Sequence, residues 1–78
     1  MEPVSDAHIA FGREVRRRRE AKKWSQEELS RRAHMHLSYI GQTERGQRNI
    51  SLTSILRLAE ALDTPPEKLV AATGSAGK

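Results

Sequence analysis

Apolar residues recur along this 78-residue chain at the three- and four-residue spacing of helices, and they never alternate with polar residues over the length of a strand. Proline, the strongest helix breaker, occurs only at positions 3, 65 and 66. The interval from 7 to 62 is therefore free to be helical. The pattern predicts an all-α fold of five helices.

The first predicted helix runs from about residue 6 to about residue 22. Phe11 and Val15 lie one turn apart and give it a short apolar stripe. The run RRRRE, residues 16–20, follows the stripe and could be taken for a nucleic-acid-binding arm. Glutamates interrupt the positive charge in and around this run, which favours a solvated helix face.

The second predicted helix, about 26–33, has the clearest start signal in the chain. Ser25 is followed three residues later by Glu28, which is the spacing of a capping box. Trp24 precedes the cap and Leu29 occupies the fourth helical position, so the two side chains can pack as a hydrophobic staple.

The third predicted helix begins near His36 and ends near Arg45. Gly46 is a suitable stop because glycine accepts the left-handed backbone conformation without steric cost. The inward-facing positions are expected to be Met35, Tyr39, Ile40 and Thr43. The outward-facing positions are expected to be Leu37, Ser38, Gly41 and Gln42.

Two further helices are predicted. The fourth starts after Ser51, ends near residue 62 and has an apolar arc wider than one core contact needs. The fifth, about 65–71, begins with TPPE, where Thr64 is expected to cap the helix, Pro65 to occupy its first position and Glu67 to reach back.

Only two or three residues join the second and third predicted helices. A connection that short forces a tight bend, and such a pair is a helix-turn-helix unit, whose second helix can enter the major groove of DNA. The motifs SQEEL from residue 25, SYI from residue 38 and ERGQRN from residue 44 occur together at characteristic separations. From about Gly12 to Leu69 the chain resembles the Xre-type, lambda-repressor-like helix-turn-helix domains.

The resemblance implies a compact five-helix domain that binds a palindromic operator as a symmetric homodimer. We expect a flexible N-terminus at 1–5, the domain at 6–71 and a flexible tail at 72–78. Three residues depart from the family pattern. His34 replaces the usual glycine of the turn, His36 replaces a better helix cap, and Thr43 replaces a larger aliphatic residue.

The family reads bases from the start of its third helix and contacts the DNA backbone from the loop that follows. On this chain the resemblance implies base contacts from Leu37, Ser38, Gln42 and Arg48. It implies phosphate contacts from Gln26, Tyr39, Arg45, Asn49 and Ser51.

Each of these roles has a chemical basis and an alternative. The Gln42 amide can pair with N6 and N7 of adenine, and Arg48 suits the O6 and N7 of guanine or a phosphate. Leu37 can contact only a thymine methyl group, or it can simply pack. For the phosphate set, the alternatives are packing, solvent exposure or bracing of the loop.

Two further sets of residues have structural roles. Arg19 lies one turn after Val15, on the inward side of the first helix, where a charged group needs a partner. The resemblance implies that Glu44 is the matching acid. We therefore expect a shielded ion pair between Arg19 and Glu44. A dimer would form through the fifth helix and the spare apolar arc of the fourth, using Ile55, Leu62, Leu69 and Val70.

Composition agrees with a small DNA-binding domain. Fourteen basic against ten acidic residues give a net charge of +4, which suggests a polyanionic partner. The apolar fraction is 36% and there is no cysteine, so self-association is a reasonable way to bury more apolar area. No apolar run approaches the ~20 residues of a membrane span, and no signal peptide is evident, so we expect a cytoplasmic protein without membrane contact.

Catalytic and metal-binding functions are disfavoured. His34 and His36 lie two residues apart with no cysteine or suitably spaced carboxylate, so we expect neither a metal nor another cofactor. A stand-alone regulator of this length resembles the controller proteins of restriction–modification systems, which regulate their own gene and the endonuclease gene. The alternatives are an antitoxin, a phage-type repressor or a protein-interaction module of the same fold. Contact with RNA polymerase stays open, because the sequence identifies no surface for it.

Overall fold

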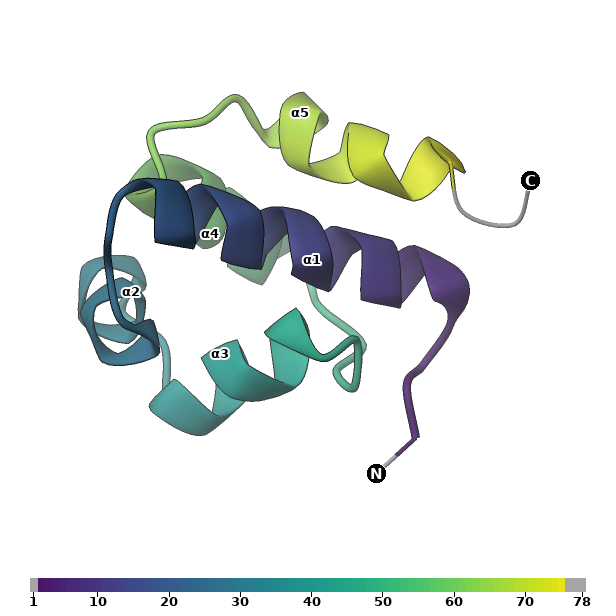
Figure 1. The fold of residues 1–78 in the computed structure, drawn as a ribbon, viewed down its shortest axis with the longest axis horizontal. Helices are drawn as coiled ribbons and strands as arrows, with labels where there is room; N and C mark the ends of the chain where they lie inside the picture. The colour runs from purple at the N-terminus through teal and green to yellow at the C-terminus, as the bar shows by residue number, and fades with distance from the viewer. Residues whose placement is uncertain (1, 76–78) are drawn as a thin grey trace.

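The computed structural model describes residues 2–75, which form five α-helices, one short 3-10 helix and no strand (Figure 1). The prediction of an all-α, five-helix fold is confirmed. The helices are α1 (Asp6–Ala21), α2 (Gln26–Ala33), α3 (Leu37–Glu44), α4 (Leu52–Ala61) and α5 (Pro66–Ala71), followed by the 3-10 helix η1 (Ala72–Ser75).

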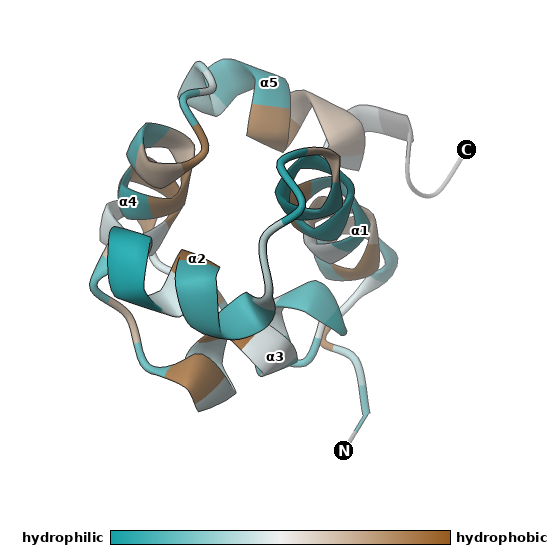
Figure 2. Ribbon diagram, turned by 60° about the vertical axis from the view of Figure 1, so that its left-hand side comes forward, coloured by the Kyte–Doolittle hydropathy of each residue, from teal (hydrophilic) through white to brown (hydrophobic). Residues whose placement is uncertain are grey.

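Helix α1 runs across the middle of the molecule, with α5 and η1 along one side and α3 along the other (Figure 1). Helix α2 packs against α3 and α4, and α4 packs against α5. Hydrophobic segments are seen on α4 and α5, whereas the outer side of α2 is hydrophilic (Figure 2). The buried apolar side chains come from all five helices: Phe11, Val15, Leu29, Ala33, Ile40, Leu58, Ala59, Leu62 and Leu69.

Part of the predicted dimer surface is wrong. Leu62 and Leu69 are 1% and 0% exposed within the single chain, so they have no area left to bury against a second copy. Helix α4 packs against both α2 and α5, which accounts for part of its wide apolar arc, whereas Leu52 and Leu56 on the same helix are 71% and 48% exposed. Ile55 is half-buried and Val70 is 44% exposed, so these two residues stay available.

Serine hydroxyls cap three of the helices. Ser5, Ser25 and Ser51 accept hydrogen bonds from the backbone N–H groups three residues later, as helix N-caps do. The predicted Thr64 cap is wrong. Helix α5 begins one residue later than expected, with Pro65 as the cap residue, and the Thr64 hydroxyl instead donates to the Leu62 carbonyl at 3.1 Å.

Both ends of the described chain contact the domain. The Val4 N–H donates to the Gly46 carbonyl at 2.7 Å, which ties the segment before α1 to the loop after α3. Residues 72–75, expected to belong to a flexible tail, form η1 and lie against α1. Residues 1 and 76–78 lie outside the described residues, so the predicted domain limits stay predictions.

Two glycines allow α1 and α3 to approach closely. A Cβ atom on Gly12 of α1 would lie 2.2 Å from the Thr43 carbonyl oxygen and 2.7 Å from that of Glu44. Gly46, which ends α3, has a φ of +72°, and its Cβ atom would lie 2.8 Å from the Ile9 backbone. Backbone atoms cannot move aside cheaply, so these contacts fix the position of α3 against α1.

Candidate nucleic-acid interface

The turn between α2 and α3 has the left-handed residue that the sequence pattern requires. His34 takes φ 57° and ψ 46°, a conformation for which glycine is the usual residue. The Met35 N–H then donates to the Ser30 carbonyl at 3.0 Å, which closes the end of α2. His36 makes no side-chain capping bond at the start of α3, as its weak capping chemistry predicts. The chain therefore forms the helix-turn-helix bend despite two unfavourable histidines.

Helix α3 is held by one face and exposed on the other. Ile40 and Thr43 are buried, whereas Leu37 is 45% exposed and Ser38 is exposed. The expectation that Gly41 faces outward is wrong: it is buried, and a Cβ atom there would lie 3.2 Å from Arg45 Nη1. The long side chains of Arg45 and Gln26 cover it.

An ion pair joins α1 to the end of α3. Arg19 Nε and Nη2 donate to the two carboxylate oxygens of Glu44 at 2.7 and 3.0 Å, and only 10% and 3% of the two side chains is exposed. Arg19 Nη1 also donates to the Trp24 carbonyl at 2.7 Å. The hydrogen bond with Glu44 raises the pKa of Arg19 above its usual value, so the Arg19 guanidinium group keeps its positive charge.

Gln26 takes part in the same network. Its Nε2 donates to Glu44 Oε1 at 3.0 Å, so the first residue of α2 is linked to the last residue of α3. The side chain is half-buried. The predicted phosphate contact of Gln26 would use the second N–H of Nε2, which this bond does not occupy, together with the backbone N–H groups at the start of α2.

Gln42, Arg48 and Tyr39 form a second cluster, which the sequence reasoning missed as a unit. The guanidinium carbon of Arg48 lies 4.5 Å from the centre of the Tyr39 ring, and Arg48 Nη1 donates to Gln42 Oε1 at 3.1 Å. Arg48 therefore touches two other residues that are predicted to contact DNA. The only signal in the sequence is the one-turn spacing of Tyr39 and Gln42, and it does not reveal that the loop residue folds back.

The remaining predicted contacts lie in the loop after α3 and at the start of α4. Arg45 is exposed, and its Nε donates to Gln47 Oε1 at 2.9 Å. Asn49 Oδ1 is 3.3 Å from His8 Nε2 on α1, which braces the loop against the first helix. The exposed Ser51 serves as the cap of α4.

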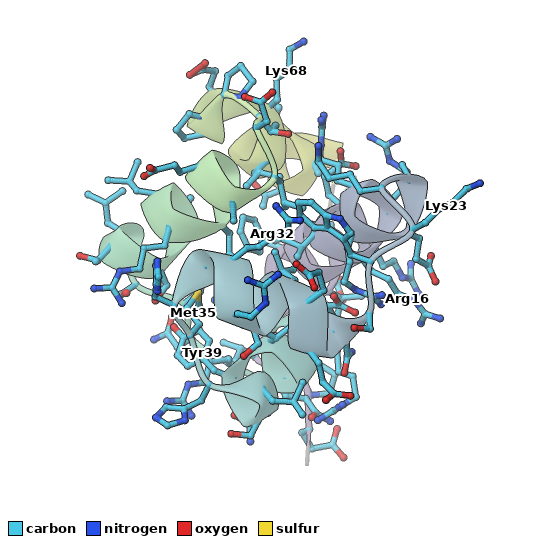
Figure 3. All side chains as sticks on the ribbon, turned by 90° about the vertical axis from the view of Figure 1, so that its left-hand side faces the viewer. Arg16, Lys23, Arg32, Met35, Tyr39 and Lys68 are labelled. Atoms are coloured by element: carbon cyan, nitrogen blue, oxygen red, sulfur yellow. The ribbon has the colours of Figure 1, made fainter. Side chains whose placement is uncertain are left out.

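Apart from the buried Arg19, the arginines of the basic run of α1 lie away from the cluster around Tyr39. Arg16 pairs with Glu20, and both Arg17 and Arg18 pair with Glu14. Figure 3 shows Arg16 and Lys23 projecting away from Tyr39. This arrangement agrees with the expected solvated helix face.

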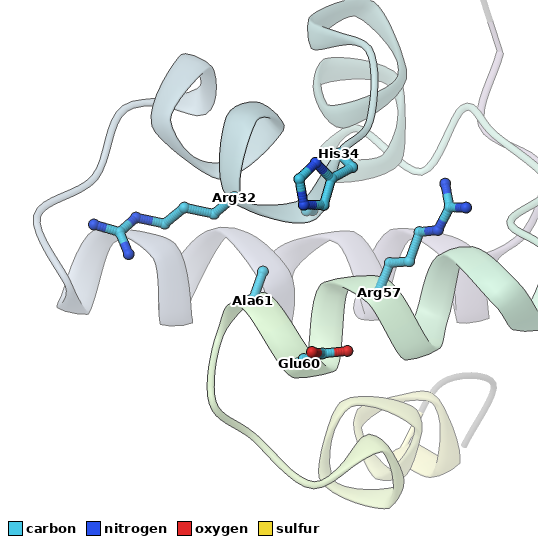
Figure 4. Close-up of a pocket in the computed structure, with 6 residues that line it drawn as sticks. Arg32, His34, Arg57, Glu60 and Ala61 are labelled. Carbon is cyan, nitrogen blue, oxygen red and sulfur yellow. The ribbon is translucent and has the colours of Figure 1, made fainter.

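One open hollow of about 320 Å³ lies between the end of α2 and α4 (Figure 4). The hollow is lined by Arg32, His34, Arg57, Glu60 and Ala61. The guanidinium group of Arg32 stacks on the Trp24 ring. The hollow contains none of the residues predicted to contact DNA. Within residues 2–75, no three histidine or acidic side chains are placed to hold a metal, and no helix is long and apolar enough to span a membrane.

Comparison with known proteins agrees with this geometry. Residues 15–69 match the helix-turn-helix family. The chain is 37% identical to the control protein C.BamHI of Bacillus amyloliquefaciens over 86% of this chain and 84% of that protein. It is also 37% identical to the control protein C.SmaI of Serratia marcescens, over 91% and 93% of the two chains.

A solved structure gives the same result. The restriction-modification controller protein C.AhdI from Aeromonas hydrophila superimposes with a TM-score of 0.78 and 48% sequence identity, over 80% of this chain and 94% of that chain. The matched segment includes the α2–α3 unit, whose turn and exposed face are described above. The chain therefore belongs to the helix-turn-helix family, among relatives that are restriction-modification controller proteins.

Proposed function

We propose that this chain is a transcriptional regulator that binds double-stranded DNA as a homodimer, on a palindromic operator controlling its own gene and that of a restriction endonuclease. The observation that carries the proposal is the exposed face of α3. Leu37, Ser38 and Gln42 lie on this helix, whose opposite face is anchored by the buried Ile40. A helix anchored in this way can present side chains to base edges in a major groove.

The flanking residues supply phosphate contacts in this proposal. Arg45 and Asn49 are exposed in the loop after α3, Gln26 opens α2 and Ser51 caps α4. These positions lie around α3, the helix proposed to contact the bases, and they provide donors that can contact the DNA backbone. Phosphate contacts release counterions, so affinity should fall steeply as salt rises.

The dimer surface is taken from side chains that the single chain leaves uncovered. Leu52 is 71% exposed and Leu56 is 48% exposed, and the two lie one turn apart on α4. Ile55 and Val70 line a mostly apolar hollow of about 180 Å³ between α1, α4 and α5. A second copy that covers these residues would remove apolar area from water without disturbing Leu62 and Leu69 in the core.

Selection of bound duplexes from a random pool, followed by salt-titrated affinity for the enriched sequence, tests the proposal. The expected result is a palindrome with half-site centres one helical turn, ~34 Å, apart and a steep salt dependence. Sedimentation should show a dimer that Leu56→Asp weakens, with Thr53→Asp on the same helix as the exposed control. No enriched sequence, with only weak binding that salt abolishes, would contradict the proposal and point to a protein partner.

A further inference from the structure

The Tyr39–Arg48–Gln42 cluster restricts what Gln42 can offer to a base. Tyr39 and Gln42 are half-buried and lie one turn apart on α3, and Arg48 reaches back to both from the following loop. The Tyr39 ring supports the plane of the guanidinium group, and the guanidinium group in turn orients the Gln42 amide.

The donor and acceptor of the Gln42 amide are assigned by this contact. Arginine carries only donors, so the Gln42 atom 3.1 Å from Arg48 Nη1 is the carbonyl oxygen Oε1. The Nε2 group keeps both of its N–H donors. In the free protein, the Gln42 amide therefore has two N–H donors that Arg48 does not use, beside a positively charged group that carries only donors.

Guanine and adenine respond differently to such a surface. Guanine shows two acceptors in the major groove, O6 and N7, whereas adenine shows the N7 acceptor and the N6 donor. The two-bond pairing of glutamine with adenine needs Oε1 to accept from N6. Here one lone pair of Oε1 already accepts from Arg48, so an adenine N6 group that used the second lone pair would have to lie beside the guanidinium donors.

We infer, on the basis of the DNA-binding function proposed above, that Gln42 and Arg48 act as one donor unit that selects guanine at the base Gln42 contacts. Arg48 thereby determines specificity through Gln42, in addition to any contact of its own. This replaces the adenine contact that the Gln42 side chain alone would favour.

Parallel selections from a random duplex pool test the inference, using the native chain and the variants Gln42→Ala, Arg48→Met and Arg45→Met. The operator position that loses its preference in Gln42→Ala is the one Gln42 reads. Arg48→Met keeps an aliphatic side chain for the Tyr39 ring but removes every donor. Arg45→Met is the matched control, because Arg45 is an exposed arginine of the same loop that donates to Gln47. Thermal melts establish that each variant is folded.

The native chain should select guanine at that position, and Arg48→Met should select adenine there while the other positions keep their bases. Replacing this guanine by 7-deazaguanine, which lacks the N7 acceptor, should weaken native binding about tenfold. The inference is overturned if the native chain selects adenine, if Arg48→Met selects guanine equally well, if Arg45→Met causes the same switch, or if Gln42→Ala changes no position. In those cases an enriched palindrome would still support the proposed function. If no protein enriches any sequence, the proposed function itself fails.

Discussion

Arg19 and Glu44 form a two-bond ion pair between the last turn of α1 and the end of α3, with donor–acceptor distances of 2.7 and 3.0 Å. They lie twenty-five positions apart in the chain, and the pair is nearly inaccessible to water. Gln26 adds a third bond to the same carboxylate, so α1, α2 and α3 meet at Glu44. The pair therefore helps to set the geometry of the helix-turn-helix unit as well as the stability of the core.

Glu44→Ala should lower the free energy of unfolding by about 3 kcal/mol, because it leaves the buried Arg19 charge without its partner. Urea denaturation followed by circular dichroism measures this. Glu60→Ala, on the exposed side of α4, is the control and should change stability little. The double variant Arg19→Met with Glu44→Leu should lose less than Glu44→Ala alone, since no charge is then stranded. If Glu44→Ala and the native chain have the same free energy of unfolding, the pair does not stabilise the fold.

Gly12→Ala should destabilise the fold by about 3 kcal/mol, at the upper end of the effect of overpacking. The added methyl group would lie 2.2 Å from the Thr43 carbonyl oxygen, and only a shift of α1 from α3 can relieve that contact. The matched control is Gly74→Ala, where the new atom would meet nothing within 4 Å. Thermal and urea unfolding should separate the two variants clearly. Similar curves would mean that the helices can move apart at little cost.

Thr43→Val should stabilise the protein by about 1 kcal/mol. Thr43 is 2% exposed, and within residues 2–75 its Oγ1 has no hydrogen-bond partner, so the hydroxyl is buried without compensation. Valine has nearly the same shape and removes that polar group. Thr53→Val, at an exposed position of α4, controls for the general effect of the substitution. A loss of stability in Thr43→Val would indicate that the hydroxyl does find a partner in solution.

Lowering the pH should reduce the stability of the native chain more than that of the Glu14→Gln variant. Hydrogen bonds from Arg17 and, secondarily, Arg18 lower the pKa of Glu14 below its ordinary value of 4.5. A depressed pKa in the folded state stabilises the fold above pH 4.5, and this contribution is lost as the pH falls through the folded-state pKa. The stability difference between the native chain and Glu14→Gln should therefore be present at pH 7 and shrink toward pH 3. Denaturation curves across this range measure it, and a constant difference would contradict the assignment.

The sequence predicted most of the fold because its signals are local. The Ser25 cap, the buried Ile40 and the close spacing of α2 and α3 follow from residues a few positions apart. The helix-turn-helix assignment needed no distant contact.

The wrong predictions concern features that depend on contacts between residues far apart in the sequence. An apolar arc looks the same whether it faces a neighbouring helix or a second copy, so Leu62 and Leu69 were misassigned to the dimer. The bond from Arg48 to Gln42 and the brace between Asn49 and His8 depend on how the loop after α3 folds back. Helical periodicity carries no information about that path.

The close crossing at Gly12 has a consequence for the DNA partner. If α3 reads the bases as proposed, its close contact with the backbone of α1 at Gly12 and the bond from Glu44 to Arg19 should resist any tilt of α3 relative to α1 in an irregular groove. The duplex would then have to change its shape to fit the protein, and its bending and groove width depend on base steps that no side chain touches. Operators with identical contacted bases but stiffer or softer intervening steps should accordingly bind with different affinities.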